Sequence, residues 1–375
     1  MPVKLSQIDN RQLKTIGGCL PNGREQLSKF LNDIVREDQF STGLRFESLN
    51  AIREQAKLEL FVGRRIDVVV SVARSMALLV KLEPNLRHRL QEQGAFEYKE
   101  MMKLCYELSS QVGDLSSYDL AIVAQSLAFM GFRHEGLFGA ISSEFQKKYN
   151  KPSCVQLSKL AEAYAQLDIK DSKLTSFLGK AARALQRAPT NPPFTMRSRS
   201  TIGWSLALLD PAQVPSVINS RFLIDDECEI KAWSRIYQAL IVTEAITPYE
   251  YFPRRKEVWN MKGSESSNSF ELNVKRGIDL FLRNVPHSIE ENSNVAGVLI
   301  DFVLYLEHRT IAIECDGYQY HYSTGPDGGR PFGRDLMQDQ VLKRCGMEVV
   351  HISSYEWNEY FAAQILSGKL GIPQP

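Results

Sequence analysis

The sequence predicts two parts of different fold class: a solenoid-like array of α-helical repeats, followed by a compact C-terminal α/β domain. Three observations support this division. Apolar residues recur at helical spacing through roughly the first 250 residues, a short polar segment then interrupts the pattern, and apolar runs of strand length follow. We expect an N-terminal extension over 1–40, helical repeats over 41–262 and the α/β domain over 265–370.

Four segments of the first part carry Ala and Leu at helical spacing. They are RIDVVVSVARSMALLVKL (65–82), YDLAIVAQSLAFMGF (118–132), SCVQLSKLAEAYAQLDI (153–169) and SRSTIGWSLALLD (198–210). Such periodicity is typical of amphipathic or buried helices. We therefore expect a helix in each segment.

Three of these segments share a local pattern, in which a large residue and then Ala precede an apolar pair and a helix stop. The alanines are Ala128, Ala165 and Ala207, so the intervals are 37 and 42 residues, and an earlier copy at Ala77 lies 51 residues before the first. Periods near 40 are typical of stacked helical hairpins. The irregular spacing leaves a second interpretation open, a non-repetitive helical domain that is rich in Ala and Leu.

The window from Ser172 to Leu209 contains no acidic residue. Its basic residues include Lys180, Arg183, Arg187, Arg197 and Arg199. Such a run could lie against the phosphates of RNA. The alternative is a solvated surface that is balanced by acidic residues elsewhere, which agrees with a net charge of only +1.

The composition excludes several classes of protein. The six cysteines are far apart and form no CxxC pair, which argues against a zinc site or a disulfide framework. No apolar run approaches the ~20 residues that span a bilayer, so we expect no membrane partner. A secretory signal is not expected either, because MPVKLSQIDNRQLKTIGG has no apolar core.

The polar segment KGSESSNSF (262–270) marks the predicted boundary, and strands and helices mix beyond it. The expected order is helix, β-hairpin, helix, strand, helix. The segments are a helix at 270–285, strands at 298–306 and 310–316, a helix at 334–345, a strand at 347–353 and a closing helix at 355–366.

Carboxylates gather at the end of the second predicted strand. Alternation sends Ile311 and Ile313 to one side and Glu314 and Asp316 to the other, where Asp301 of the neighbouring strand can join them. Clustered carboxylates repel one another, so at least one pKa rises unless a divalent cation compensates.

Two further groups could approach the same cluster. Gly317 lets the chain turn, so His321 could return toward the carboxylates. Asp335 and Asp339 are one helical turn apart and can present a second acidic pair from the helix.

These residues carry a family resemblance. The segments LIDF, IAIECDGYQYHY and RDLMQDQVLKRCGMEVVHISSYEW, within 297–357, resemble the RAP domain, and more distantly the very-short-patch-repair endonucleases. The resemblance implies a nuclease-like α/β fold of the PD-(D/E)xK type. It also implies helical repeats ahead of this fold and work on RNA in mitochondria or plastids.

The resemblance assigns roles to individual residues. Asp301 matches the strand aspartate that binds metal in active relatives, and Glu314 matches the acidic position of the (D/E)xK element. Asp316 stands where that element has its lysine, so His321 would have to act as acid, base or ligand. Asp339 matches an aspartate on the corresponding helix. We expect a fold that contacts RNA without cleaving it; the alternative is an RNA or DNA endonuclease that uses Mg²⁺ or Mn²⁺.

Aromatic and basic residues follow the acidic strand. Tyr318 and Tyr320 could stack on RNA bases or line a covered face of the sheet. The glycine-rich loop TGPDGGRPFGR (324–334) lacks the Walker lysine and is not a P-loop, but it offers Arg330 and Arg334 to phosphate.

Together these features predict an organellar RNA-binding protein that acts in RNA processing or stability, or as a component associated with the mitochondrial ribosome. The expected partners are ribosomal RNA or an organellar transcript, and ribosomal proteins. The expected location is the mitochondrion, with the plastid as the alternative. A third hypothesis, from a different class, is a scaffold that holds proteins with its helical repeats.

Overall fold

The computed structural model describes residues 96–148, 153–187, 194–224, 229–248, 257, 269–317, 323, 325–326 and 330–373. The predicted N-terminal extension and the predicted helix at 65–82 lie outside these residues. The chain divides into two compact units, Met1–Asn150 with Ser323–Gly329, and Lys151–Tyr322 with Arg330–Pro375.

The described helices of the first unit are α6 (Phe96–Gln111), α7 (Ser117–Met130) and α8 (Glu135–Lys148). Both α6 and α7 pack against α8. Helix α7 confirms the prediction at 118–132 and ends at Gly131, whose φ of 71° is the left-handed conformation that glycine adopts without strain.

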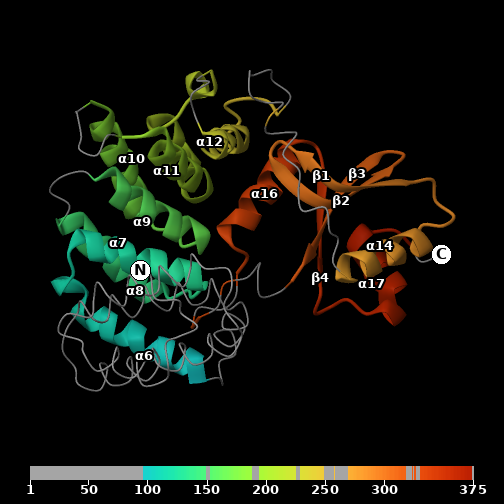
Figure 1. Cartoon of the computed structure of the whole chain (residues 1–375), viewed down its shortest axis with the longest axis horizontal. Coiled ribbons are helices and arrows are strands. Elements are labelled where there is room, and N and C mark those ends of the chain that lie inside the picture. Colours follow the sequence, from blue (N-terminus) through green and yellow to red (C-terminus); the bar gives the residue numbers. More distant parts are fainter. Residues whose placement is uncertain are drawn as a thin grey trace, which may run out of the picture. The chain divides into compact units, whose positions relative to one another are not determined.

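The second unit begins with α9 (Cys154–Gln166), α10 (Ser172–Arg187), α11 (Met196–Leu209) and α12 (Ile230–Val242). Two 3₁₀ segments, η3 (Pro211–Ser216) and η4 (Ser220–Leu223), connect α11 to α12. Helix α11 packs against both α9 and α12 and is buried along most of its length, while α10 packs against α9 (Figure 1). The helices predicted at 153–169 and 198–210 are thus confirmed.

The helices α7, α9 and α11 begin in the same way. A hydroxyl residue, Ser116, Ser153 or Thr195, caps each one by accepting a hydrogen bond from the backbone N–H three residues later. Each cap stands 12 residues before the alanine of the shared pattern, at 128, 165 and 207. The similarity between the three segments therefore covers a whole helix and its N-cap.

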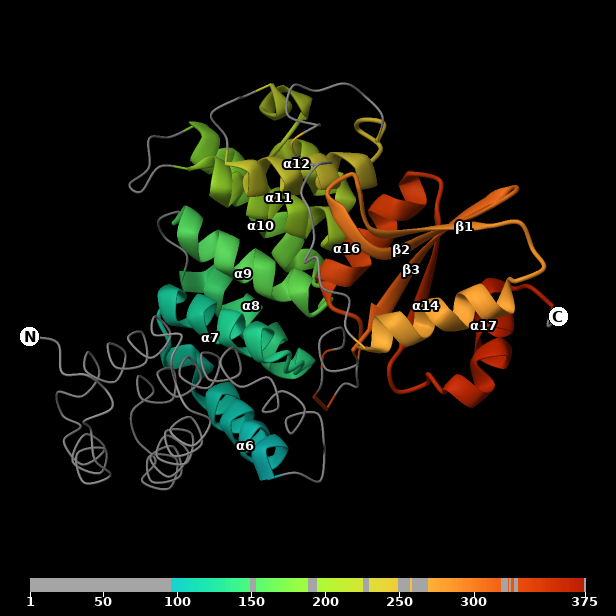
Figure 2. The same ribbon diagram turned by 45° about the vertical axis from the view of Figure 1, so that its right-hand side comes forward.

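The α/β part of the second unit has the order helix, three strands, helix, strand, helix. The elements are α14 (Ser269–Phe281), β1 (Ser288–Val295), β2 (Val298–Leu306), β3 (Arg309–Asp316), α16 (Gly333–Arg344), β4 (Glu348–Ser353) and α17 (Ala362–Leu370). They form one sheet of order β1-β2-β3-β4, antiparallel except for the parallel pair β3–β4 (Figure 2). A parallel pair needs a crossover, and α16 lies in it.

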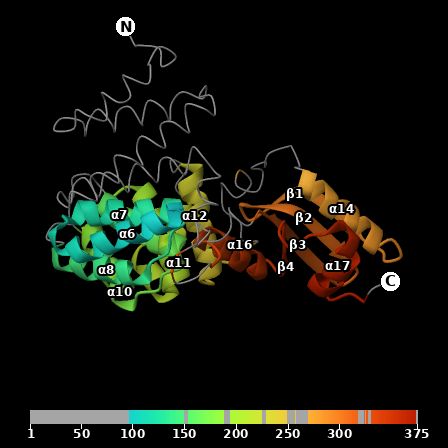
Figure 3. The same cartoon turned by 90° about the horizontal axis from the view of Figure 1, so that it is seen from below.

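The sheet lies between two layers of helix. Strand residues of one face, among them Phe302, Ile313 and Ile352, form a core with Ile278 of α14 and Leu366 of α17. Helix α16 contacts β2 and β4 on the other face, so the sheet separates α16 from α14 and α17 (Figure 3). Side chains of even and odd position along β3 therefore face different layers, as the alternation predicts.

Two details of the predicted order are wrong. The strand β1 was not predicted, because its sequence SIEENSNV has no apolar alternation; it is an edge strand in which one residue, Ser293, is buried. The closing helix begins at Ala362 rather than at 355. The residues before it form a turn and the 3₁₀ segment η5 (Glu359–Phe361), which Asn358 caps by accepting from the N–H of Tyr360.

Helix α16 joins the sheet to the helices of the same unit. It packs against α9, α11 and α12, and Arg344 near its end forms an ion pair with Glu244. At its start a Cβ on Gly333 would lie 1.9 Å from the carbonyl oxygen of Ala165, so only glycine fits there. The helices α9–α12 consequently share a compact unit with the sheet, whereas the predicted division falls at 262–265.

Within the part of the chain that the structure describes, no helix combines the length and apolar character needed to cross a membrane.

Candidate functional site

The structure brings Asp301 and Glu314 together on adjacent strands. The register of β2 and β3 pairs Phe302 with Ile313, which sets Asp301 opposite Glu314. The Oδ2 of Asp301 accepts a hydrogen bond of 2.7 Å from the backbone N–H of Cys315. One buried oxygen of Glu314, Oε1, has no hydrogen-bond partner among the described residues.

Asp316 and Asp339 meet at a residue that the sequence did not single out, His351. The parallel register of β3 and β4 pairs Glu314 with His351. The Nδ1 of His351 lies 2.7 Å from Oδ2 of Asp316, and its Nε2 lies 2.9 Å from Oδ1 of Asp339. The imidazole therefore bridges the end of β3 and the middle of α16.

The two ionisable groups at this point have shifted pKa values. Burial raises the pKa of Glu314 well above its ordinary value, and the negative charges of Asp301, Asp316 and Asp335 raise it further against the opposing effect of His351. Burial lowers the pKa of His351. Its hydrogen bonds to Asp316 and Asp339, and their charges, outweigh that effect and raise the pKa from 6.5 to about 10.

At neutral pH the raised pKa of His351 favours a charged imidazole. An imidazolium has two N–H donors, and here one points to each aspartate. The bridge is therefore a pair of charge-assisted hydrogen bonds that closes α16 onto the sheet.

The structure places Asp301 and Glu314, the two metal ligands that the resemblance implies, on adjacent strands. No three His, Cys, Asp or Glu side chains within the described ranges are placed to hold a metal ion. Asp316 and Asp339 face His351, and one oxygen of Asp301 is held by a backbone N–H. A site of oxygen ligands would have to draw on Asp301 and Glu314, since Asp316 and Asp339 are engaged by His351.

The two arginines predicted to contact phosphate both lie beside carboxylates. Arg330 Nη1 is 3.7 Å from Oδ2 of Asp168, at the end of α9, and Arg334 Nε is 3.2 Å from Oδ1 of Asp335. Each arginine side chain is still about half exposed, at 53% and 54%. These pairs orient the arginines toward the protein's own acids.

The basic window falls on α10 and the start of α11. Lys180 and Arg187 are exposed on α10, and Arg183 is partly exposed beside them. Positions seven residues apart lie on one side of a helix, so Lys173, Lys180 and Arg187 form one stripe. Arg197, at the start of α11, is exposed as well. None of these five side chains has an ion pair with another described residue.

Arg199 differs from the other basic residues of the window. Its guanidinium carbon lies 4.4 Å from the ring centroid of Phe194 and 5.4 Å from that of Phe222, and its Nε donates to the carbonyl of Phe194. Burial lowers its pKa. Arg199 is thus partly buried against two phenylalanine rings, unlike the exposed cations of α10.

Three predicted site residues, Tyr318, Tyr320 and His321, lie outside the described residues. The residue that sequence reasoning missed, His351, had a usable signal. In EVVHIS it stands between Val350 and Ile352, which both face the core, so alternation sends it to the carboxylate side.

Comparison with known proteins adds no assignment, since no family model matches the chain and no curated protein matches it.

Proposed function

We propose that this protein binds single-stranded RNA through the exposed basic stripe of α10. The observation that carries the proposal is the stripe itself: Lys173, Lys180 and Arg187 lie in register along one helix and have no ion pair among the described residues. Seven helical residues rise about 10 Å, so the three cations span roughly 20 Å. Cations spaced along a surface suit a phosphate backbone, whose binding releases counterions.

Two features support a helical-repeat scaffold for this surface. The N-cap lies 12 residues before the shared alanine in α7, α9 and α11, which is expected of repeated units. In addition, α9 and α11 pack directly against each other, as equivalent helices of neighbouring repeats do.

We propose further that the α/β part is a RAP-like, nuclease-related fold without cleavage activity. Asp316 stands in place of the motif lysine, and the nearby cation, His351, has both N–H groups directed at aspartates. A metal-dependent endonuclease is the second candidate, because Asp301 and Glu314 adjoin each other as in that chemistry.

The proposed setting is an organelle, the mitochondrion first and the plastid second, with ribosomal RNA or an organellar transcript as ligand. A net charge of +1 suits a protein that lies partly among ribosomal proteins. Co-sedimentation of the tagged protein with organellar ribosomes tests this setting, and a protein found only in fractions without ribosomes would contradict it.

Salt-dependent binding to an unstructured RNA tests the basic stripe. The double variant Lys180→Glu/Arg187→Glu should bind more weakly and lower the salt slope by about 1.4, since each contact to a single strand contributes about 0.7. The matched control is Arg221→Glu/Lys231→Glu, which exchanges two exposed cations of the same region for the same change in net charge. Equal affinities of the two variants would contradict the proposal.

Incubation of the wild-type protein with RNA and Mg²⁺ or Mn²⁺ separates the two candidate functions. We expect intact RNA. Cleavage by the wild type that disappears in both Asp301→Ala and Glu314→Ala would establish the endonuclease instead.

A further inference from the structure

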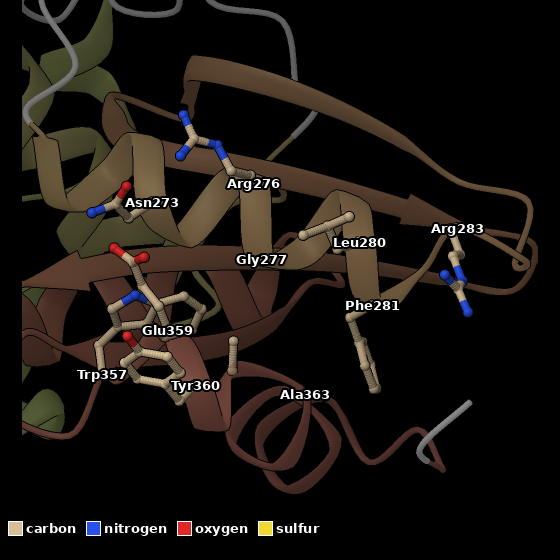
Figure 4. Close-up of a pocket in the computed structure, with 11 residues that line it drawn as sticks. Asn273, Arg276, Gly277, Leu280, Phe281, Arg283, Trp357, Glu359, Tyr360 and Ala363 are labelled. Atoms are coloured by element: carbon tan, nitrogen blue, oxygen red, sulfur yellow. The ribbon is translucent and has the colours of Figure 1, made fainter.

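A groove lies on the opposite side of the sheet from the carboxylates, between α14 and the segment before α17. Its volume is about 320 Å³. One wall is the side of α14 that carries Asn273, Arg276 and Leu280, and the other includes Trp357 and Tyr360 (Figure 4). Nothing in the site described above uses these residues.

The indole of Trp357 lines this groove because α14 has a glycine at the point of contact. A Cβ on Gly277 would lie 2.7 Å from Cη2 of Trp357, so any larger residue would push the ring away. The Nε1 of Trp357 is buried and has no acceptor among the described residues. A buried donor without a partner is costly, and an acceptor from a bound molecule could relieve it after a small rotation of the ring.

The groove also presents apolar surface to solvent. The ring of Tyr360 is almost fully exposed, at 96%, and the neighbouring wall contributes Leu280 at 64%. A tyrosine ring exposed at the mouth of a groove offers a flat surface on which another planar ring can stack.

The charged residues of the lining favour an anionic ligand. Arg276 and Arg283 are both exposed, stand at different edges of the groove, and have no ion pair with the rest of the described chain. The acid among the lining residues is Glu359. A ligand with a planar ring and negative groups on either side would match this arrangement.

From these features we infer that the groove binds one unstacked nucleotide, with its base on Tyr360 and its phosphates near Arg276 and Arg283. The volume lies at the lower end of the range for small-molecule sites, about 300–1,000 Å³, which suits a nucleotide better than a folded protein surface. The inference rests on the proposed function insofar as the nucleotide belongs to an RNA chain; the same chemistry would accept a free nucleotide.

The test uses the full chain and two probes, an unstructured 12-nucleotide RNA and adenosine monophosphate alone. Tyr360→Ala should weaken RNA binding about 5- to 150-fold, the equivalent of the roughly 1–3 kcal/mol of one stacked base. Tyr360→Phe, which keeps the ring, should bind as the wild type does. Arg276→Gln/Arg283→Gln should weaken RNA binding and lower its salt slope by up to about 1.4.

The matched control is Tyr355→Ala, which removes a tyrosine that is 91% exposed but does not line the groove. It should leave RNA binding unchanged. Far-UV circular dichroism of each variant confirms that the fold is kept, and Tyr360 is exposed enough that its removal leaves no cavity in the core.

The outcomes separate this inference from the proposed function. If Lys180→Glu/Arg187→Glu weakens RNA binding while the groove variants do not, RNA binding stands and the nucleotide groove is refuted. If the wild type binds no RNA but binds adenosine monophosphate in a manner that needs Tyr360, the groove stands and the proposed function fails. If Tyr360→Ala changes the binding of neither probe but abolishes the binding of a ribosomal protein, the groove is a protein-docking surface and the inference is overturned.

Discussion

Substitution of His351 by Gln tests the electrostatic bridge between β3 and α16. Glutamine keeps a polar side chain of similar reach but cannot carry the positive charge that faces Asp316 and Asp339. The pKa of His351 is raised from 6.5 to about 10, so its contribution to the free energy of unfolding is complete below about pH 6.5. That contribution is lost as the pH rises through 10.

The size of the effect follows from the same pKa. A rise from 6.5 to about 10 corresponds to at most about 5 kcal/mol, at 1.36 kcal/mol per pH unit. The side chain is 31% exposed, and solvent screening reduces this figure. We therefore expect His351→Gln to lower the free energy of unfolding by about 2–3 kcal/mol at pH 6 and by much less at pH 10.5.

Urea unfolding at pH 6, 8, 9.5 and 10.5 is monitored by hydrogen exchange in peptides from β4 and α16. It measures the difference in the free energy of unfolding between wild type and variant at each pH. Both proteins carry Glu314→Gln in this comparison, because the raised pKa of Glu314 also makes the fold less stable as pH rises and because the charge of His351 affects that pKa. A difference that does not change between pH 6 and pH 10.5 would refute the reasoning, and so would an NMR titration that places the pKa of His351 near 6.5.

Three further predictions concern single contacts. Gly333→Ala should destabilise the second unit by about 1–3 kcal/mol in thermal unfolding, because the new Cβ would collide with the carbonyl of Ala165. The control Gly368→Ala lies in α17 with open space around it and should be neutral or stabilising by up to about 1 kcal/mol, so equal effects of the two changes would contradict the docking of α16 on α9. Ser153→Ala and Thr195→Ala should each lower the free energy of unfolding in urea by about 1 kcal/mol. Ser153→Thr and Thr195→Ser should keep most of that stability, since either hydroxyl caps a helix, and a loss as large as that of the alanine variants would argue against capping. Glu314→Gln should raise the free energy of unfolding above that of the wild type more at pH 9 than at pH 5, because glutamine does not ionise in this buried place. If variant and wild type differ by the same free energy at both pH values, Glu314 titrates as an ordinary carboxyl.

Much of the second unit follows from sequence periodicity alone. The strands β2 and β3 were predicted because both read as apolar runs with Asp301 and Glu314 as interruptions, and the alternation correctly placed Ile311 and Ile313 in the core. The strand β1 could not be found in this way, because an edge strand with exposed side chains needs no apolar face. Its partner is chosen by backbone hydrogen bonds, which leave no pattern in the sequence.

The candidate site was predicted less completely than the fold. Strand alternation groups Glu314 with Asp316, but their neighbours on β4 depend on the register of a parallel pair across a crossover of more than 30 residues. Sequence spacing says nothing about that register. The histidine expected near the carboxylates was therefore His321, whereas the structure places His351 between Asp316 and Asp339. The arginines of the glycine-rich loop lie beside Asp168 and Asp335.

The positive charge of His351 on β4 differs from that of a catalytic lysine in the number of N–H donors it offers. A lysine at the position of Asp316 would carry three N–H donors on a flexible stem, enough to hold an acid and still contact water or phosphate. His351 supplies a positive charge in the same neighbourhood but has only two donors, and Asp316 and Asp339 receive both. His351 itself then has no donor left to stabilise charge that develops on a phosphate. Asp316 instead accepts from the histidine, and the bridge to Asp339 holds β3, β4 and α16 together.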